Sequence, residues 1–286
     1  GEERNREMSS DSTRHQFVDT HAHLSDEQFA TDRSDVLERS ARVGVSQIVN
    51  VAFSPSMWND AVALSGAHRS VAFTLGVHPN NAGEWHDAVA SELRRMVDIH
   101  RPAAIGETGI DYYWNAFPRE VQIEAFRQQV AIARDTRLPV IIHMRGEVEQ
   151  DIRTVLQDND PLVCVFHSFD GSAELAEWIV GKGWYVGVGG LMTRRSARAL
   201  QDILRTLPLS QLLLETDSPY LAPTGWSEKR NSPEALPFIA AHLARTLDLD
   251  VSEVARETTA NARRVFGLAD LPAAGAAGDW NPVTSG

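Results

Sequence analysis

The middle of the chain contains three consecutive segments: AAIGETGID (residues 103–111), PREVQIEAFRQQVAIAR (118–134) and PVIIHMR (139–145). The first and the third are short apolar runs of the kind found in buried strands. The second has apolar residues at helical spacing and begins with proline, which is favoured in the first turn of a helix. Together the three segments predict a strand–helix–strand unit, and such a unit joins two parallel strands.

The same alternation extends from residue 17 to residue 267. Strands are predicted at 17–24, 47–53, 71–78, 103–111, 139–145, 162–169, 185–190 and 212–220. Helices are predicted at 32–43, 56–68, 87–99, 118–134, 148–156, 172–180, 193–206, 233–244 and 252–266. Eight strands alternating with helices over about 250 residues predict an α/β fold, a single-domain (β/α)8 TIM barrel. An open doubly wound sheet is the alternative with the same alternation.

The composition narrows the class of protein. Of the 286 residues, 43% are hydrophobic and 23% are charged, a balance that excludes a disordered or fibrous chain. We expect a cytoplasmic protein, because no apolar run approaches the ~20 residues of a membrane span and residues 1–16 are too polar for a secretory signal. A single cysteine, Cys164, excludes an intramolecular disulfide framework. Residues 1–16 and the Ala/Gly/Pro-rich residues 268–286 are predicted to be poorly ordered tails.

The charge of the chain bears on its partners. The 27 basic and 39 acidic residues give a net charge of −12, which disfavours a long groove for nucleic acid, since phosphate neutralisation drives that binding. Bound divalent metals would reverse the potential locally, so a nucleic-acid enzyme is still compatible with this charge.

Histidines gather at the ends of the predicted strands: His21, His23, His78, His143 and His167. In a barrel these ends meet at one mouth, where active sites are found. His21 and His23 are two residues apart on a strand, so period-two alternation places both imidazoles on the same side, with Val18 on the other.

Two carboxylates join these imidazoles at the mouth. With Glu107 and Asp217, four histidines form a two-metal ligand set: His21, His23, His143 and His167. Nitrogen and oxygen ligands without cysteine suit Zn, Mn, Fe, Co or Ni, and can hold Mg weakly. Glu107 is predicted to bridge two divalent ions, and Asp217 to bind metal and accept a proton from water. The predicted chemistry is metal-assisted hydrolysis, with Glu107 and Asp217 as the catalytic residues.

A series of motifs in the chain resembles one family. The motifs are FVDTHAHL (17–24), GVHP (76–79), IGETGIDY (105–112), IIHMR (141–145), FHSFDG (166–171) and LLETDSPYLAP (213–223). In this order they resemble the TatD family of metal-dependent hydrolases, which are amidohydrolase-like TIM barrels. The resemblance implies a divalent-metal deoxyribonuclease, a 3′-to-5′ exonuclease on single-stranded DNA, with metal ligands at the same six positions. Met144 and Asp170 depart from the family's pattern on the phosphate side of the site.

Two residues on the strand ends are predicted to contact substrate. His78 ends a strand just before Pro79, where capping of the barrel rim is the alternative role. Arg145 shares a strand face with His143 and can clamp a phosphate through two nitrogens. A rim ion pair of Arg145 with Glu107 or Asp111 is the alternative.

Further substrate contacts are predicted in two loops. Arg230 and Asn231 follow the last strand, a common place for phosphate binding in barrels, although solvated loop charges are equally common. The aromatic residues 112–114 follow Glu107 and can stack on bases of a single strand, or simply pack at the rim.

Two other functions compete with the nuclease. A small-molecule amidohydrolase would cleave a cyclic amide or ester with the same two-metal site, and a binding protein would hold metal without turnover. Many amidohydrolase barrels bridge their metals with a carbamylated lysine on the fourth strand. Glu107 occupies that place here, which favours the nuclease.

Overall fold

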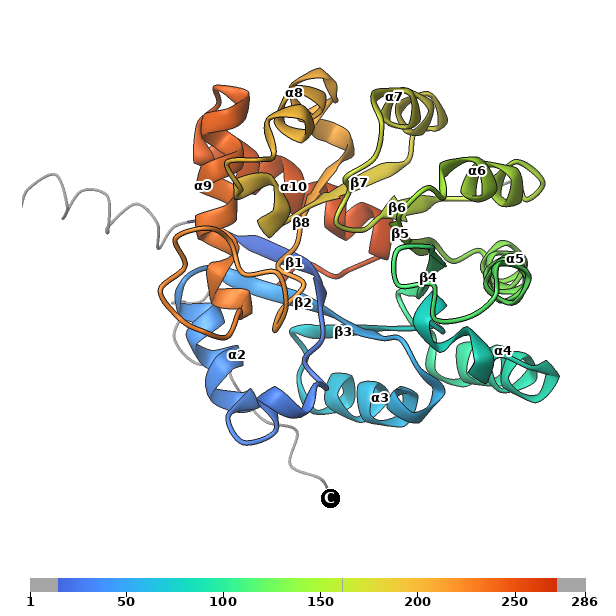
Figure 1. The fold of residues 1–286 in the computed structure, drawn as a ribbon. Coiled ribbons are helices and arrows are strands. Elements are labelled where there is room, and N and C mark those ends of the chain that lie inside the picture. The colour runs from blue at the N-terminus through green and yellow to red at the C-terminus, as the bar shows by residue number, and fades with distance from the viewer. Residues whose placement is uncertain (1–14, 161, 272–286) are drawn as a thin grey trace, which may run out of the picture.

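Eight parallel strands form a barrel in the computed structural model, which describes residues 15–160 and 162–271 (Figure 1). The strands are β1 (Phe17–Ala22), β2 (Val45–Ala52), β3 (Val71–Leu75), β4 (Ala104–Asp111), β5 (Val140–Arg145), β6 (Cys164–Phe166), β7 (Tyr185–Val188) and β8 (Leu212–Leu214). Each pairs with the next one along the chain. The circle closes just beyond β8, where Asp217 N donates to His21 O and His23 N donates to Ser218 O, both at 2.8 Å. The predicted TIM barrel is confirmed.

The strand predictions are right in position, but six of the eight run past the observed carboxyl end of the strand. The segments 162–169 and 212–220 were expected to be extended throughout, but β6 ends at Phe166 and β8 at Leu214. Ser168 has a φ of 46° and Asp217 a φ of 55°, so the backbone turns into the left-handed region there and cannot continue a strand. Both turns lie at the mouth of the barrel.

Helices surround the barrel, as the alternating pattern predicts (Figure 1). They are α2 (Arg33–Arg42), α3 (Trp58–Ala67), α4 (Asp87–His100), α5 (Arg119–Thr136), α6 (Glu149–Gln157), α7 (Ala173–Lys182), α8 (Arg198–Thr206), α9 (Leu236–Leu247) and α10 (Val251–Phe266). The helix predicted from residue 193 begins only at Arg198, because a 3-10 turn, η5 (Gly190–Thr193), precedes it. Within the described residues, no helix is both long and apolar enough to cross a membrane.

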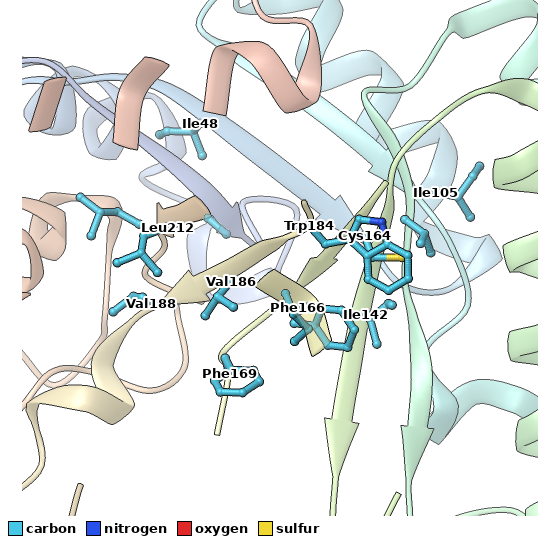
Figure 2. Packing of buried hydrophobic residues seen from close by; sticks show 14 of the residues in the cluster. Ile48, Ile105, Ile142, Cys164, Phe166, Phe169, Trp184, Val186, Val188 and Leu212 are labelled. Atoms are coloured by element: carbon cyan, nitrogen blue, oxygen red, sulfur yellow. The ribbon is translucent and has the colours of Figure 1, made fainter. Parts of the chain in front are cut away.

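Two apolar layers hold the fold together. The outer layer packs the strands against the helices, and Figure 2 shows part of it, with Ile142, Cys164, Phe166 and Trp184 close together. Cys164 is fully buried in this layer. The inner layer fills the barrel with one or two side chains from most strands, among them Val18, Val49, Ala104, Ile141, Val165 and Leu213.

Helix α10 closes the end of the barrel opposite the mouth. Its Ala262 and Phe266 pack against the inner layer. The Thr259 hydroxyl donates to Gln16 O, just before β1, and Asn261 Nδ2 donates to Leu212 O at the start of β8. Access to the barrel interior is therefore from the carboxyl ends of the strands. The predicted tails, 1–16 and 268–286, lie outside the described residues except for 15–16 and 268–271.

Candidate metal centre

Six side chains named from the sequence meet at the mouth of the barrel. They are His21 and His23 at the end of β1, Glu107 on β4, His143 on β5, His167 just after β6 and Asp217 just after β8. Pairs of their nitrogen and oxygen atoms lie 3.0 to 3.9 Å apart. The structure thus brings together residues that are as much as 196 positions apart (21 to 217) in the sequence.

Irregular strand pairing aims these side chains inward. Regular alternation would place Val18 on the side of β1 opposite His21, yet Val18 lies in the inner layer while His21 faces the same interior. The β1–β2 register shifts between Asp19 and Ala22, and this shift changes which residues face inward. The strict alternation predicted for β1 is therefore wrong, although both histidines do point into the mouth. The β4–β5 register shifts in the same way around Glu107.

The two oxygens of Glu107 face different imidazoles. Oε1 lies 3.2 Å from His21 Nε2 and 3.9 Å from His23 Nε2. Oε2 lies 3.1 Å from His143 Nδ1 and 3.6 Å from His167 Nε2. A carboxylate between two sets of nitrogen ligands is the arrangement of a bridge between two ions.

Asp217 completes the first of these sets. Its Oδ1 lies 3.0 Å from His23 Nε2 and 3.5 Å from both His21 Nε2 and His167 Nε2. Ligand atoms bound at about 2.05 Å in tetrahedral geometry lie about 3.3 Å from one another, so the spacing of this cluster fits a metal. The donor set also fits, because it combines imidazoles with carboxylates and lacks cysteine.

Three of the imidazoles have a further polar partner on the side away from the centre, and this partner fixes which ring nitrogen faces the centre. These partners were not assigned a role from the sequence. Asp111 Oδ2 lies 2.9 Å from His143 Nε2, and Glu215 Oε1 lies 2.8 Å from His167 Nδ1. His23 Nδ1 lies 3.0 Å from the carbonyl oxygen of Val51. In each ring the other nitrogen is left for a metal, as is common in metalloproteins. One signal was in the sequence: Asp111 and Glu215 stand close to Glu107 and Asp217 on the same strand ends.

The buried carboxylates of the cluster are stabilised by positive charge next to them. Burial by itself raises the pKa of Glu107, but His167, His21 and His143 hold it well below the usual range. Burial lowers the pKa of His167, yet Glu215, Asp217 and Glu107 raise it to about 10. Burial and the stacked ring of His167, 3.4 Å away between centroids, lower the pKa of His21. Protons supply the positive charge in the protein alone, and divalent cations can supply it in their place.

His78 faces the same centre with a different chemistry. Its Nδ1 accepts a hydrogen bond of 2.9 Å from the Asn80 backbone N–H, so a neutral ring carries its proton on Nε2. Burial, reinforced by His143, lowers the pKa of His78 to about 3, which keeps the ring neutral. Nε2 lies 3.7 Å from Glu107 Oε2. The fixed tautomer makes His78 a hydrogen-bond donor at the centre in the metal-free protein, and its ring also lies close enough to Glu107 and His143 for the three to hold an ion.

A cavity of about 710 Å³ lies over the cluster. Its wall is partly apolar, with Phe53, Trp114, Met144 and Tyr220, and partly basic, with Arg145 and Arg194. The Arg145 guanidinium lies over the Tyr113 ring, 4.0 Å from its centroid. The alternative ion pair of Arg145 with Glu107 or Asp111 is not formed among the described residues, because both carboxylates face His143 instead.

The aromatic residues after Glu107 divide into two kinds. The Tyr112 hydroxyl donates to Asp151 Oδ2 at 2.7 Å and its ring packs against the core. Tyr113 and Trp114 are each 62% exposed, and Trp114 lines the cavity. Packing thus accounts for Tyr112, whereas Tyr113 and Trp114 are free to meet a ligand.

Arg230 and Asn231 lie outside this cavity. The Arg230 guanidinium makes two hydrogen bonds to Asp32, of 2.9 and 2.6 Å, and lies over the ring of Phe29. Asn231 is buried, and its Nδ2 donates to Thr216 O and Tyr220 O. Asn231 thus holds the segment on either side of Asp217, and Arg230 ties the loop after β8 to the segment before α2. Neither side chain lines the cavity.

Comparisons with known proteins agree on one family. A profile described as TatD related DNase matches residues 18–267. An uncharacterized metal-dependent hydrolase, YabD of Bacillus subtilis, is 34% identical over 252 residues, covering 87% of this chain and 98% of that protein. A protein of Erwinia amylovora named 3′-5′ ssDNA/RNA exonuclease TatD is 34% identical over 260 residues, covering 88% of this chain and 100% of that protein.

A solved structure gives the same result for the fold. The crystal structure of YjjV, a TatD homologue from Escherichia coli, superposes with a TM-score of 0.81 at 28% identity, covering 88% of this chain and 98% of that chain.

Proposed function

Because the chain belongs to the TatD-related DNase family of metal-dependent hydrolases, we propose that it is a divalent-metal-dependent deoxyribonuclease that shortens single-stranded DNA from the 3′ end. The observation that carries the proposal is Glu107, whose two oxygens face two separate sets of imidazole nitrogens. Such a centre suits the hydrolysis of phosphodiester bonds, in which both the attacking and the leaving oxygen need stabilisation. The exonuclease name of the Erwinia relative supports the choice of substrate.

The side chains have distinct tasks in this reaction. His21, His23, Glu107, His143, His167 and Asp217 would hold two divalent ions (Mg, Mn or Zn), which would supply a lowered pKa for a water molecule and polarisation of a phosphoryl oxygen. Asp217 accepts the proton of the attacking water on its carboxylate, whose low pKa keeps it ionised beforehand. His78 donates a hydrogen bond from its Nε2–H to a phosphate oxygen. The proton stays on Nε2, because the Asn80 backbone N–H holds the ring in that tautomer. The proposal thus keeps His78 as a substrate contact.

The wall of the cavity suits a single strand with exposed bases. Trp114 lines the cavity and offers an aromatic face on which bases stack. Arg145, whose guanidinium covers one face of the exposed Tyr113 ring, supplies a charge for phosphate next to it. In a duplex the faces of these bases are covered by the neighbouring base pairs of the stack. The stacking surface therefore favours single-stranded ends.

The competing amidohydrolase function is disfavoured by the position of the lysines. A carbamylated lysine needs a lysine at the mouth, and the lysines of the sequence are Lys182 and Lys229. Neither lines the cavity. Glu107 is left as the bridging group, which favours the nuclease. The proposal also includes a cytoplasmic location, which the single buried cysteine supports.

Product analysis with two labels tests the proposal. Single-stranded DNA labelled at its 5′ end should shorten stepwise, whereas DNA labelled at its 3′ end should release a labelled mononucleotide at once. Matched duplex DNA and RNA strands, and a set of cyclic amides, serve as comparison substrates. Hydrolysis of a cyclic amide without any cleavage of DNA would overturn the proposal in favour of the amidohydrolase.

A further inference from the structure

Arg194 lines the cavity but belongs to none of the motifs discussed so far. It follows η5 in the loop between β7 and α8, and its side chain is exposed. No carboxylate among the described residues forms an ion pair with it, whereas the neighbouring loop cation Arg230 is paired with Asp32. An arginine in the wall of an acidic cavity with no anionic partner is placed to bind an anionic ligand.

The loop holds Arg194 in a fixed position. The Thr193 hydroxyl donates to Gly190 O at 2.6 Å and accepts from Thr224 N at 2.9 Å, which ties the loop to the segment after β8. Gln201 Nε2 donates to Met192 O at 2.8 Å. A Cβ on Gly190 would lie 2.1 Å from Leu221 O, so this close contact requires glycine. A cation on a rigid support binds a ligand without the cost of ordering the loop.

Glu149 and Asp170 line the same cavity as Arg194 and are the candidates for an ion pair with it. Glu149 is engaged by Ser172, whose N–H and hydroxyl donate to it at 2.7 and 2.6 Å. Asp170 is exposed and also lines the cavity, so a pair between Asp170 and Arg194 in solution is the alternative role for this arginine. The experiment must separate the two roles.

We propose that Arg194 binds a phosphate of the DNA strand next to the bond that is cleaved, as a substrate-positioning residue. This inference rests on the proposed nuclease function. Arg145 is the last residue of β5 and Arg194 follows β7, so the two cations lie on separate sectors of the mouth with the end of β6 between them. If Arg145 and Arg194 each bind a phosphate, they fix the path of the DNA strand across the metal centre from two sides. Such contacts to phosphates do not depend on the base sequence.

The proposal is tested with oligonucleotides in which the charge of one phosphate at a time is removed. The kcat/KM for cleavage of single-stranded oligonucleotides is measured for the wild type, Arg194→Ala, Arg194→Lys and the matched control Arg195→Ala, whose exposed arginine does not line the cavity. Each oligonucleotide carries one neutral methylphosphonate at a different linkage. Arg194→Ala should lower kcat/KM about tenfold through KM and reduce the salt slope by about 0.7, the value for one phosphate of a single strand.

The neutral linkage identifies the phosphate. At one position the methylphosphonate should weaken the wild type, Arg194→Lys and Arg195→Ala, yet have no further effect on Arg194→Ala. Equal kcat/KM values for Arg194→Ala and Arg195→Ala at every linkage would overturn the proposal. It would also be overturned if adding Asp170→Asn to Arg194→Ala restored kcat/KM, because Arg194 would then only neutralise Asp170. A wild type that cleaves none of the oligonucleotides would overturn the nuclease function itself.

Discussion

At the scale of single residues, the centre is defined by what stands behind each imidazole. His143 meets Asp111 through one nitrogen and Glu107 through the other, and His167 meets Glu215 and Glu107 in the same way. A buried carboxylate behind a ring sets its tautomer and leaves a lone pair for a metal. The same logic gives His78 a different role, because the Asn80 N–H occupies its Nδ1 and leaves the ring proton on Nε2.

Asp111→Asn should lower metal affinity about 10- to 100-fold. The new amide keeps the bond from Trp114 N with its oxygen and presents its NH₂ to His143, which moves the ring proton to Nδ1 and removes the metal-binding lone pair. Calorimetric metal titration measures the effect, with Asp170→Asn as the control. Unchanged affinity in Asp111→Asn would contradict this role.

Glu107→Ala and Asp217→Asn should each reduce cleavage of DNA at least 100-fold. The first removes the carboxylate between the two sets of imidazoles, and the second removes the proton acceptor. Initial rates under saturating metal measure the loss, and circular dichroism checks that the barrel is intact. Full activity in either folded variant would disprove the assignment of the site.

At the scale of elements, the alternation of apolar runs and helical patterns was enough to predict the barrel and the convergence of six side chains. It was not enough to predict how β1 turns Val18 and His21 to the same interior, since a register shift depends on pairing with β2 and not on β1 alone. Nor could it predict the partner of Arg230, because Asp32 lies 198 residues away and only the folded loops bring them together.

Arg230→Ala should destabilise the protein by about 1 kcal/mol, the upper range for a partly exposed ion pair, and leave KM for DNA unchanged. The hydrogen bond from Arg230 holds the pKa of Asp32 below its usual value. The stabilisation is therefore present above about pH 4, the ordinary pKa of aspartate, and is lost as the pH falls through the lowered pKa. Urea unfolding of the wild type and of Arg230→Ala measures the difference in their stability as a function of pH. The range from pH 3 to pH 7 spans about one unit below and three units above the ordinary pKa of aspartate. A variant with weaker DNA affinity and unchanged stability would contradict this reading.

Phe266→Ala should cost about 3 kcal/mol of stability, because the ring at the end of α10 closes the barrel interior and its removal leaves a cavity. The mouth is at the opposite end, so the activity per folded molecule should not change. Thermal unfolding compared with Ile99→Ala, whose side chain is 57% exposed, provides the measurement. Equal melting temperatures for the two variants would show that α10 does not seal the barrel.

At the scale of the whole molecule, a net charge of −12 works against binding of DNA. Under the proposed function this conflict is resolved locally: divalent ions bound at the centre would offset its carboxylates, and Arg145 and Arg194 supply positive charge on the wall of the cavity. Binding of the substrate is therefore expected to depend on the metal as strongly as cleavage does.

The most direct test of the account is the rate of cleavage of 5′-labelled single-stranded DNA as a function of the number of divalent ions bound per chain. Metal-free protein is titrated with Mn, Mg or Zn while bound metal and cleavage are followed together. The metal-free protein should cleave no DNA, and activity should rise as the two sets of ligands joined by Glu107 are filled. Full cleavage of DNA by the metal-free protein, or none by protein that has bound two ions of every metal, would contradict it.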